Sequence, residues 1–366
     1  MTAPFILPDT RPYPEQPVKN GLLLHASSLA HSTSAAQRKL AAESLQTDIR
    51  GMLQQNHYLG LSVAMSMVAD ADAYQALLSN LDSVLSAEND HELQWFAMPL
   101  VLVAGCNQAQ NLTLNTPTAA LSACLENHPH LRALNQATWL PFLIPSTELS
   151  EINVGQWFQA KQSPEAAQAF AAQFKPSELS LPSGQSVHVV FALGYGDKKI
   201  QTALHQNLLK AGLPLMQLWQ EALATTGVTL FVNPLTPASP LHALTEGSHM
   251  RQRMAMDVFS TNAIRAIRLQ SPRVGVVIAA QQGGKVMFSF NATDSAFELA
   301  PQIFQWVLSP TDNIAIVQQN FLDLMAECRV EHLYMLRNPL PENSEPVTYA
   351  QALKLDGFNP FFAETV

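Results

Sequence analysis

Short runs of apolar residues alternate along the chain with segments in which apolar residues recur at helical spacing. The clearest apolar run lies at residues 187–193. Valine, phenylalanine and leucine dominate it, which is typical of a buried strand. Gly194, Gly196 and Asp197 then interrupt the run with turn-forming residues. Beyond Asp197, apolar residues recur at helical spacing until Gly212. The segment therefore predicts a strand, a turn and a helix, the repeating unit of α/β folds.

Other segments show the same two periodicities. Residues 95–103 are apolar at almost every position, which is typical of a strand buried on both faces, while Pro99 indicates an edge or a bulge. A short strand is expected at residues 21–26. The predicted core strands are residues 62–68, 95–103, 187–193, 228–232 and 274–280, the last forming an antiparallel hairpin with 285–290. The predicted helices include residues 34–57, 74–85, 246–269 and 316–328.

These elements predict an α/β fold, a mixed sheet with helices on its faces. The order of strand, aspartate, helix and strand occurs around Asp70 and again around Asp197, so one interpretation is two similar α/β halves that arose by internal duplication. We expect a proline-rich arm at 1–20, the halves at 21–175 and 186–337, and a C-terminal tail at 338–366. The segment 175–185 is rich in proline, serine and glycine and marks the boundary.

Composition narrows the function classes. Hydrophobic residues make up 47% of the 366 residues and charged residues only 13%, which excludes a disordered chain. The net charge of −9 disfavours general binding to nucleic acid or to an anionic membrane. The first thirty residues lack the apolar core of a secretory signal, and no apolar run is long enough to span a bilayer. These features predict a soluble, cytoplasmic protein that does not bind membranes.

Cysteine and histidine patterns give no metal site. Cys106, Cys124 and Cys328 are odd in number and widely spaced, so we expect reduced thiols and neither a disulfide framework nor a zinc site. His242 and His249 flank Glu246, and we interpret them as polar residues at a helix entry. The chain contains no GxSxG nucleophile motif in a suitable context and no HExxH motif. Catalytic residues and cofactors therefore stay unassigned, and the sequence does not decide whether the protein is an enzyme.

A candidate ligand site lies at the predicted turn, from Gly194 to Lys199. Glycines between a strand and a helix let backbone amides approach an anion, and Gly194 or Gly196 would then have positive φ. Asp197 is a suitable N-cap, and Lys198 and Lys199 could attract a phosphate. The dinucleotide pattern GxGxxG is incomplete, because Lys199 occupies its third glycine position. The alternative is that the glycines serve turn geometry alone.

Arginines cluster on the predicted helix 250–269. The group Arg251, Arg253, Arg265 and Arg268, with Arg273, contains five of the eleven arginines of the chain. At 100° per residue, Met256, Ala263 and Ile267 fall on a core arc, whereas the arginines share the opposite half with Ile264 and other apolar residues. Arginine mixed with apolar residues is typical of protein interfaces, so we expect a homo-oligomer or a protein partner here. Ion pairs within the chain are the alternative.

Three hypotheses of function follow. The first is a binding, scaffold or regulatory protein, because the loops carry no catalytic constellation. The second is an enzyme or sensor that binds a nucleotide-like or other small anionic ligand at Gly194 to Lys199. The third is a subunit of an obligate homo-oligomer.

Overall fold

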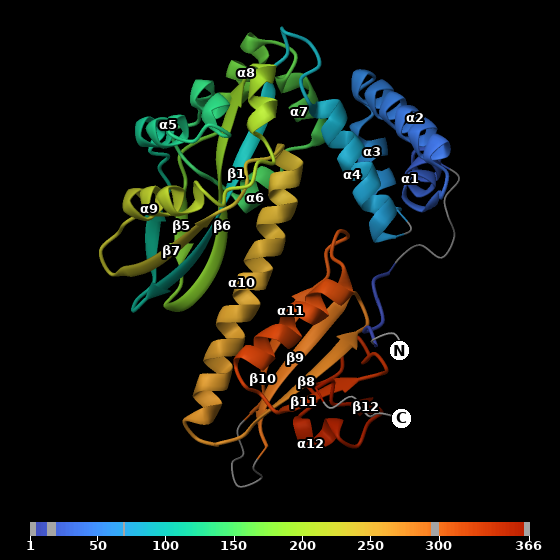
Figure 1. Ribbon diagram of the computed structural model, residues 1–366, viewed down its shortest axis with the longest axis vertical. Helices are drawn as coiled ribbons and strands as arrows, with labels where there is room; N and C mark the ends of the chain where they lie inside the picture. The colour runs from blue at the N-terminus through green and yellow to red at the C-terminus, as the bar shows by residue number, and fades with distance from the viewer. Residues whose placement is uncertain (1–4, 13–19, 69, 294–299, 362–366) are drawn as a thin grey trace. The chain divides into compact units, whose positions relative to one another are not determined.

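The computed structural model describes residues 5–12, 20–68, 70–293 and 300–361 (Figure 1). Helices account for 45% of the chain and strands for 23%, in antiparallel and mixed sheets, so the predicted α/β fold class is confirmed. The chain forms two compact units. The large unit is Gln16–Arg251, and the small unit is Met1–Glu15 together with Gln252–Val366.

The large unit is built on an antiparallel sheet in which β1 (Gln94–Cys106) and β6 (Gly184–Gly196) pair along their whole length. The strand order is β3-β6-β1-β7, and β4 also pairs with β6. The other strands of this unit are β3 (Thr138–Trp139), β4 (Ile144–Pro145) and β7 (Val228–Pro234), with a separate ladder of β2 (Gln110–Thr113) and β5 (Glu178–Leu181). The strands predicted at 95–103, 187–193 and 228–232 are therefore confirmed.

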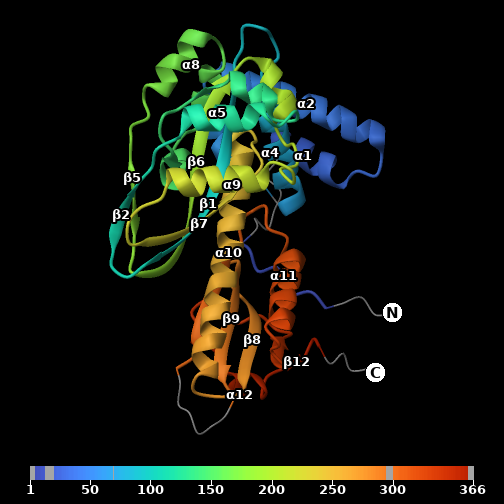
Figure 2. The same ribbon diagram turned by 60° about the vertical axis from the view of Figure 1, so that its left-hand side comes forward.

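Both faces of this sheet are covered (Figure 2). Even-numbered β1 residues such as Phe96 and Leu100 share a core with residues of α5, η1, η2 and α9. On the other face, the Trp95 indole N–H donates to the Ala160 carbonyl at 3.2 Å, and its ring contacts Phe170. The helices around the sheet are α5 (Thr118–Glu126), η1 (Arg132–Gln136), α6 (Ser146–Ser150), α7 (Val154–Ala160), α8 (Pro164–Ala171), η2 (Lys198–Ala203), α9 (Gly212–Ala222) and α10 (Pro240–Arg268).

Pro99 does not mark an edge strand, one of the two alternatives predicted for it, because β1 lies between β6 and β7. The other alternative, a bulge, agrees with the pairing, which shifts by one residue between Leu100–Pro234 and Ala97–Ala238. The Pro99 carbonyl accepts a hydrogen bond from the Leu235 amide at 2.8 Å, one residue beyond the end of β7. The missing proline N–H would face the same side. The sheet therefore loses one hydrogen bond at the end of a ladder, where the loss is tolerated.

Four helices open the large unit, α1 (Gly21–His31), α2 (Ala35–Gln54), α3 (Tyr58–Ser66) and α4 (Ala71–Leu85). The strands predicted at 21–26 and 62–68 are wrong, since these residues lie in α1 and in α3 and its end. In α3, Leu61 and Ala64 are buried, whereas Val63 is 46% exposed. A spacing of three residues between buried positions is typical of a helix. The alternation of residue types in 62–68 favoured a strand and concealed this helical spacing.

A buried ion pair joins these helices to the sheet. Lys161 follows α7, and only 3% of its side chain is exposed. Its Nζ donates to the carbonyls of Val84 and Ser86 at 2.9 Å each and to Glu92 Oε2 at 3.3 Å. Burial alone would raise the pKa of Glu92, but the hydrogen bond from the Glu88 amide and the Lys161 charge lower it below its ordinary 4.5. The pair therefore connects α4, the start of β1 and α7.

The small unit holds a mixed sheet in the order β10-β9-β8-β11-β12. Only β8 and β11 are parallel, and the β8–β9 hairpin turns at Gly283 and Gly284, both with positive φ. Phe288 and Phe321 stack on one face, whereas Ala352 packs on the other. The elements are β8 (Val274–Gln281), β9 (Lys285–Ala292), β10 (Gln302–Val307), α11 (Ile314–Glu327), β11 (His332–Leu336), α12 (Tyr349–Ala352) and β12 (Gly357–Phe358). The strand at 274–280, its hairpin and the helix at 316–328 are confirmed.

The compact units differ from the predicted halves. β1 comes from the first predicted half and β6 and β7 from the second, yet the three strands form one sheet. The boundary between the units falls within α10, not at 175–185. Local periodicity identifies a strand but not its partner, which explains the difference. Of the arm predicted at 1–20, the structure describes residues 5–12 and 20, and Leu7 is buried in the core of the small unit.

The buried ion pair yields the first testable prediction. Lys161→Met leaves the Glu92 carboxylate and two carbonyls without their donor, and we expect a loss of about 3 to 5 kcal/mol in the free energy of unfolding. Because the folded pKa of Glu92 is lowered, its contribution is present above its ordinary 4.5 and is lost as the pH falls. Urea unfolding at several pH values measures both effects. The account fails if Lys161→Met unfolds at the same urea concentration as the parent.

Candidate functional site

The glycines of the predicted ligand turn lie inside a strand. Gly194 and Gly196 belong to β6, opposite Phe96 and Gln94 of β1. Neither has positive φ, so that prediction is wrong. A Cβ on Gly194 would lie 2.7 Å from Cζ of Phe96. The space that the Phe96 ring needs therefore explains a glycine at position 194, and the ligand role of Gly194 stays a prediction.

Asp197 is an N-cap, as predicted, and its Oδ1 accepts from the Lys199 amide at 2.8 Å. The helix expected up to Gly212 is wrong, because Asp197 begins the 3-10 helix η2, which ends at Ala203. The chain then turns at His205, whose amide donates to the Pro237 carbonyl at 2.8 Å. Among the lysines, Lys198 pairs with Asp90, and Lys199 lies 3.8 Å from the Asp197 carboxylate. Lys198 and Lys199, which were predicted to attract an anion, thus each lie beside a carboxylate of the same chain.

The arginines lie along α10, which confirms the helix predicted at 246–269 and extends it towards the N-terminus. Arg268 donates to the carbonyls of Cys328 and Arg329 at 2.8 and 3.0 Å, at the end of α11. Ile264 is buried in the core of the small unit, contrary to its predicted place on the outer half of the helix. Arg253 and Arg265 are exposed, and Arg251 is half-buried. The homo-oligomer contact through these arginines stays a prediction.

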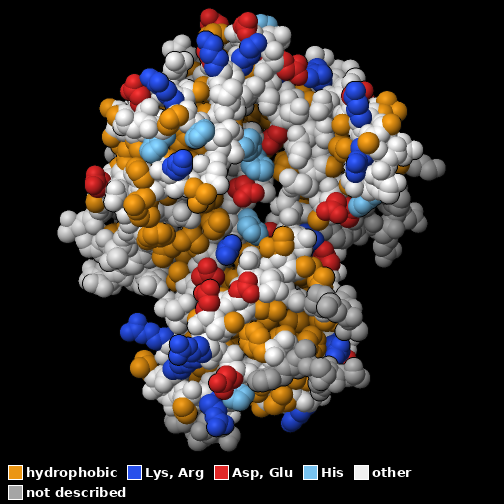
Figure 3. Space-filling view, in the orientation of Figure 1, with side chains coloured by type: hydrophobic (Ala, Val, Ile, Leu, Met, Phe, Trp, Pro, Cys, Tyr) orange, Lys and Arg blue, Asp and Glu red, His pale blue; other side chains and the backbone are white. Residues whose placement is uncertain are grey.

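A cleft of the large unit lies at the N-terminal end of α10. Its volume is about 830 Å³, within the usual range for small-molecule sites. Figure 3 shows histidine side chains on the face over this part of α10. The lining residues come from the loop after η2, the start of α9, the end of β7, the segment that follows it and α10: His205, Asn207, Leu208, Leu209, Gly212, Asn233, Pro234, Leu235, Thr236, Ala238, His242, Glu246 and Met250. Polar and apolar side chains are thus mixed, and one carboxylate is present.

Two imidazoles meet in this cleft. The rings of His205 and His242 lie edge to face with centroids 4.9 Å apart, and His242 Nε2 is 3.9 Å from Glu246 Oε1. His242, Glu246 and Met250 occupy one stripe of α10 at four-residue spacing. Burial and the charge of His242 lower the pKa of His205, and Glu246 opposes them only in part. His205 is therefore neutral at pH 7 and can both donate and accept a hydrogen bond.

The backbone of His205 is unusual. Its φ is +61°, in the left-handed region, and the other described non-glycine residues there are Asn56 and Arg329. All three follow a helix. The amides of Asn56 and Arg329 bond back to the preceding turn, whereas the His205 amide bonds to Pro237. Only His205 among them lines the cleft. A glycine would adopt the conformation without strain, so the choice of histidine fits a role for its ring.

A buried carboxyl group stands beside the cleft. Asp82 of α4 has an Oδ1 atom that is inaccessible to solvent and has no hydrogen-bond partner. Burial raises its pKa to about 6, although the Ser239 hydroxyl and the charge of His242 act in the opposite direction. Ser239 directly precedes α10, and its Oγ accepts from the His242 amide at 3.4 Å. The arrangement links α4 to the start of the helix that carries His242 and Glu246.

Few features of the sequence indicate this site. The sequence pattern groups His242 and Glu246 with His249, whereas the structure places His242 against His205, 37 positions earlier in the sequence. Nothing in the sequence distinguishes Asp82 from an ordinary polar residue of the predicted helix 74–85. His205 lies in a segment predicted to be helical. A local pattern cannot reveal a site whose residues come from α4, a loop after η2 and α10.

Comparison with protein-family models, with curated proteins and with solved structures gives no match. Within the described residues, no group of three or more histidine, cysteine or acidic side chains is arranged to hold a metal ion. No described helix has the length and apolar character needed to cross a membrane. Cys106, Cys124 and Cys328 are free thiols in the structure.

The packing role of Gly194 can be tested with a matched pair of variants. We expect Gly194→Ala to lose about 1 to 3 kcal/mol of stability, because the new methyl group meets Phe96 and Trp139. Gly51→Ala in α2 meets no atom within 4 Å and should gain about 0.5 to 1 kcal/mol. Chemical denaturation measures both. Equal stabilities of Gly194→Ala and the parent would contradict the packing account.

Asp82 predicts an unusual pH dependence. Its folded pKa of about 6 lies above its ordinary 3.8, so its contribution to stability is greatest at low pH and is lost as the pH rises through 6. We expect Asp82→Asn to be more stable than the parent above pH 6, by up to about 3 kcal/mol. The difference should vanish near pH 4. Asp72→Asn, at the exposed first turn of α4, is the control and should show no such gain.

Proposed function

We propose that this chain is a binding protein whose ligand occupies the cleft at the N-terminal end of α10. The observation that carries the proposal is the contact of the His205 and His242 rings, beside Glu246, in a cavity of about 830 Å³. Convergent polar groups on a partly apolar surface are typical of small-molecule sites. His205 also retains a left-handed backbone that a glycine would adopt with less strain.

The lining favours a neutral, polar organic ligand with an apolar part. No lysine or arginine lines the cleft, whereas Glu246 does, so a phosphate or another polyanion would meet a repulsive charge. Neutral imidazole and the amides of Asn207 and Asn233 both donate and accept hydrogen bonds. Leu208 and Leu235 offer apolar contact. Hydroxyl or amide groups on a compact carbon skeleton match these features.

The alternative of an anionic ligand at Gly194 to Lys199 has less support. Lys198 and Lys199 already face Asp90 and Asp197, which would compete with a phosphate. The glycines there have no positive φ, so the backbone amides lack the arrangement of a phosphate-binding loop. Nucleotides, S-adenosylmethionine and sugar phosphates nevertheless belong in the screen, because their binding would favour this alternative over the cleft.

The cleft proposal can be tested by ligand screening with a variant that spares the fold. His205→Gly removes the ring and relieves the left-handed backbone, so we expect equal or greater stability and loss of ligand binding. Arg329→Gly makes the same backbone change after α11, at a residue that does not line the cleft, and should bind as the parent does. Thermal shift and NMR titration with neutral polyols, amides and nucleosides provide the measurement.

Two outcomes would contradict the proposal. The first is that no compound in the neutral series shifts the resonances of His205 or His242. The second is that a bound compound keeps its affinity in His205→Gly. Glu246→Gln serves as a second cleft variant, since it removes the charge but keeps the shape, and it should admit anionic analogues that the parent rejects.

A further inference from the structure

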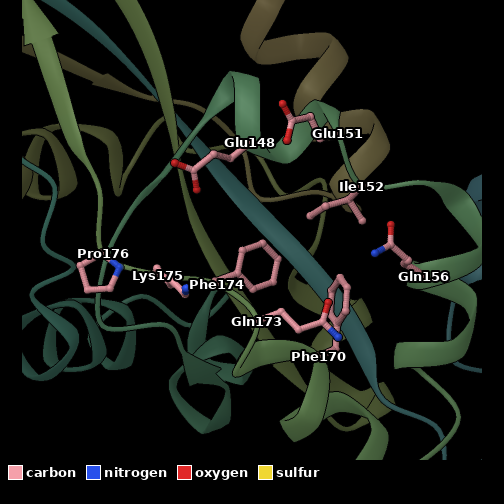
Figure 4. A pocket seen from close by; sticks show the side chains of 9 residues that line it. All are labelled: Glu148, Glu151, Ile152, Gln156, Phe170, Gln173, Phe174, Lys175 and Pro176. Carbon is pink, nitrogen blue, oxygen red and sulfur yellow. The ribbon is translucent and has the colours of Figure 1, made fainter.

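A second cavity of about 550 Å³ lies in the large unit and shares no lining residue with the α10 cleft. Its wall comes from α6, the segment between α6 and α7, α7 itself, and the chain around the end of α8. Figure 4 shows the Phe174 ring in the middle of the lining side chains, with Glu148 and Glu151 above it in the view. Carboxylates and aromatic rings therefore line one space.

The charge of this cavity is negative. Glu148 and Glu151 both line it, and neither forms an ion pair with any residue that the structure describes. They are three positions apart at α6 and its C-cap, a spacing at which like charges repel. Lys175 also lines the cavity, so two carboxylates stand against one ammonium group. A bound cation would relieve the repulsion between the glutamates.

The aromatic wall is rigid. Phe170 is only 5% exposed, and the rings of Trp95 and Trp157 hold it by edge contacts at 5.2 and 5.1 Å between centroids. Phe174 packs against Phe170 at 5.3 Å. Aromatic ring faces carry partial negative charge and attract cations. The wall thus adds to the attraction of the two carboxylates and offers apolar surface to a carbon chain.

We propose that this cavity binds a primary alkylammonium group. The ammonium head lies near the carboxylates of Glu148 and Glu151, and the alkyl stem packs on Phe174 and Ile152. The same chemistry occurs in a free alkylamine and in the lysine side chain of a polypeptide. This site is independent of the α10 cleft, so failure of either proposal leaves the other intact.

The test is a titration with small probes that share size but differ in charge. Butylammonium chloride and sodium butyrate are added to the full chain, and the indole NMR signals of Trp95 and Trp157 report on the Phe170 wall. We expect butylammonium to shift these signals with a Kd of about 1 mM or below and butyrate to leave them unchanged. Blocked lysine, N-acetyl-lysine methylamide, distinguishes the sources, because its tighter binding would favour a polypeptide and its failure a free amine.

Matched variants separate the site from a non-specific effect. Glu148→Gln and Glu151→Gln should each weaken butylammonium binding about two- to fivefold, as should Phe174→Leu. Lys175→Gln removes the competing charge and should strengthen binding. Glu126→Gln, an exposed glutamate on α5, is the control and should leave the affinity unchanged. Circular dichroism confirms that each variant is folded.

Three results would overturn the proposal. One is the absence of any shift with butylammonium up to about 10 mM, ten times the Kd of a weak site. Another is equal binding of butyrate and butylammonium. The third is an affinity that Glu148→Gln and Glu151→Gln, each shown to be folded, leave unchanged.

Discussion

The large unit depends on the hydrogen bonds of one buried ammonium group, that of Lys161. Its donors are all used, by the carbonyls of Val84 and Ser86 and by the carboxylate of Glu92. Removing an ammonium group from water costs several kcal/mol, and only this full set of acceptors offsets the cost. The carbonyls belong to the end of α4, where a helix carries partial negative charge. The interaction therefore fixes α4 against the start of β1 and the end of α7.

The position of α4 in turn positions the cleft. Asp82 lies only two residues before Val84, so the contact that holds the end of α4 also holds the Asp82 carboxyl beside Ser239. Ser239 closes the first turn of α10 through the amide of His242. His242 and Glu246 then project from the first turns of that helix. The first helices are thus connected to the proposed binding surface by a chain of contacts. It consists of the Lys161–Glu92 ion pair, the buried Asp82 carboxyl and the Ser239 cap of α10.

Three of the strands that the sequence predicted correctly lie in the interior of a sheet. β1, β6 and β8 are covered on both faces, so continuous apolar runs identified them. Residues 62–68 failed because α3 buries only Leu61 and Ala64, and a short mixed run fits a strand equally well. Gly194 failed because its neighbour Phe96 comes from another strand. The cleft was not predictable for the same reason, since His205 and His242 meet only through the fold.

The charges around the cleft are coupled through His242. A positive charge on His242 favours the ionised form of Asp82 and the neutral form of His205. The ionised Asp82 carboxylate is costly, because its Oδ1 atom has no hydrogen-bond partner. The fold thus accepts a destabilising carboxylate beside the start of α10, whereas burial is the main cause that keeps His205 neutral. Such a local cost is common at functional sites. The neutral His205 ring, which contacts His242, keeps a hydrogen-bond acceptor that a protonated imidazole would lack.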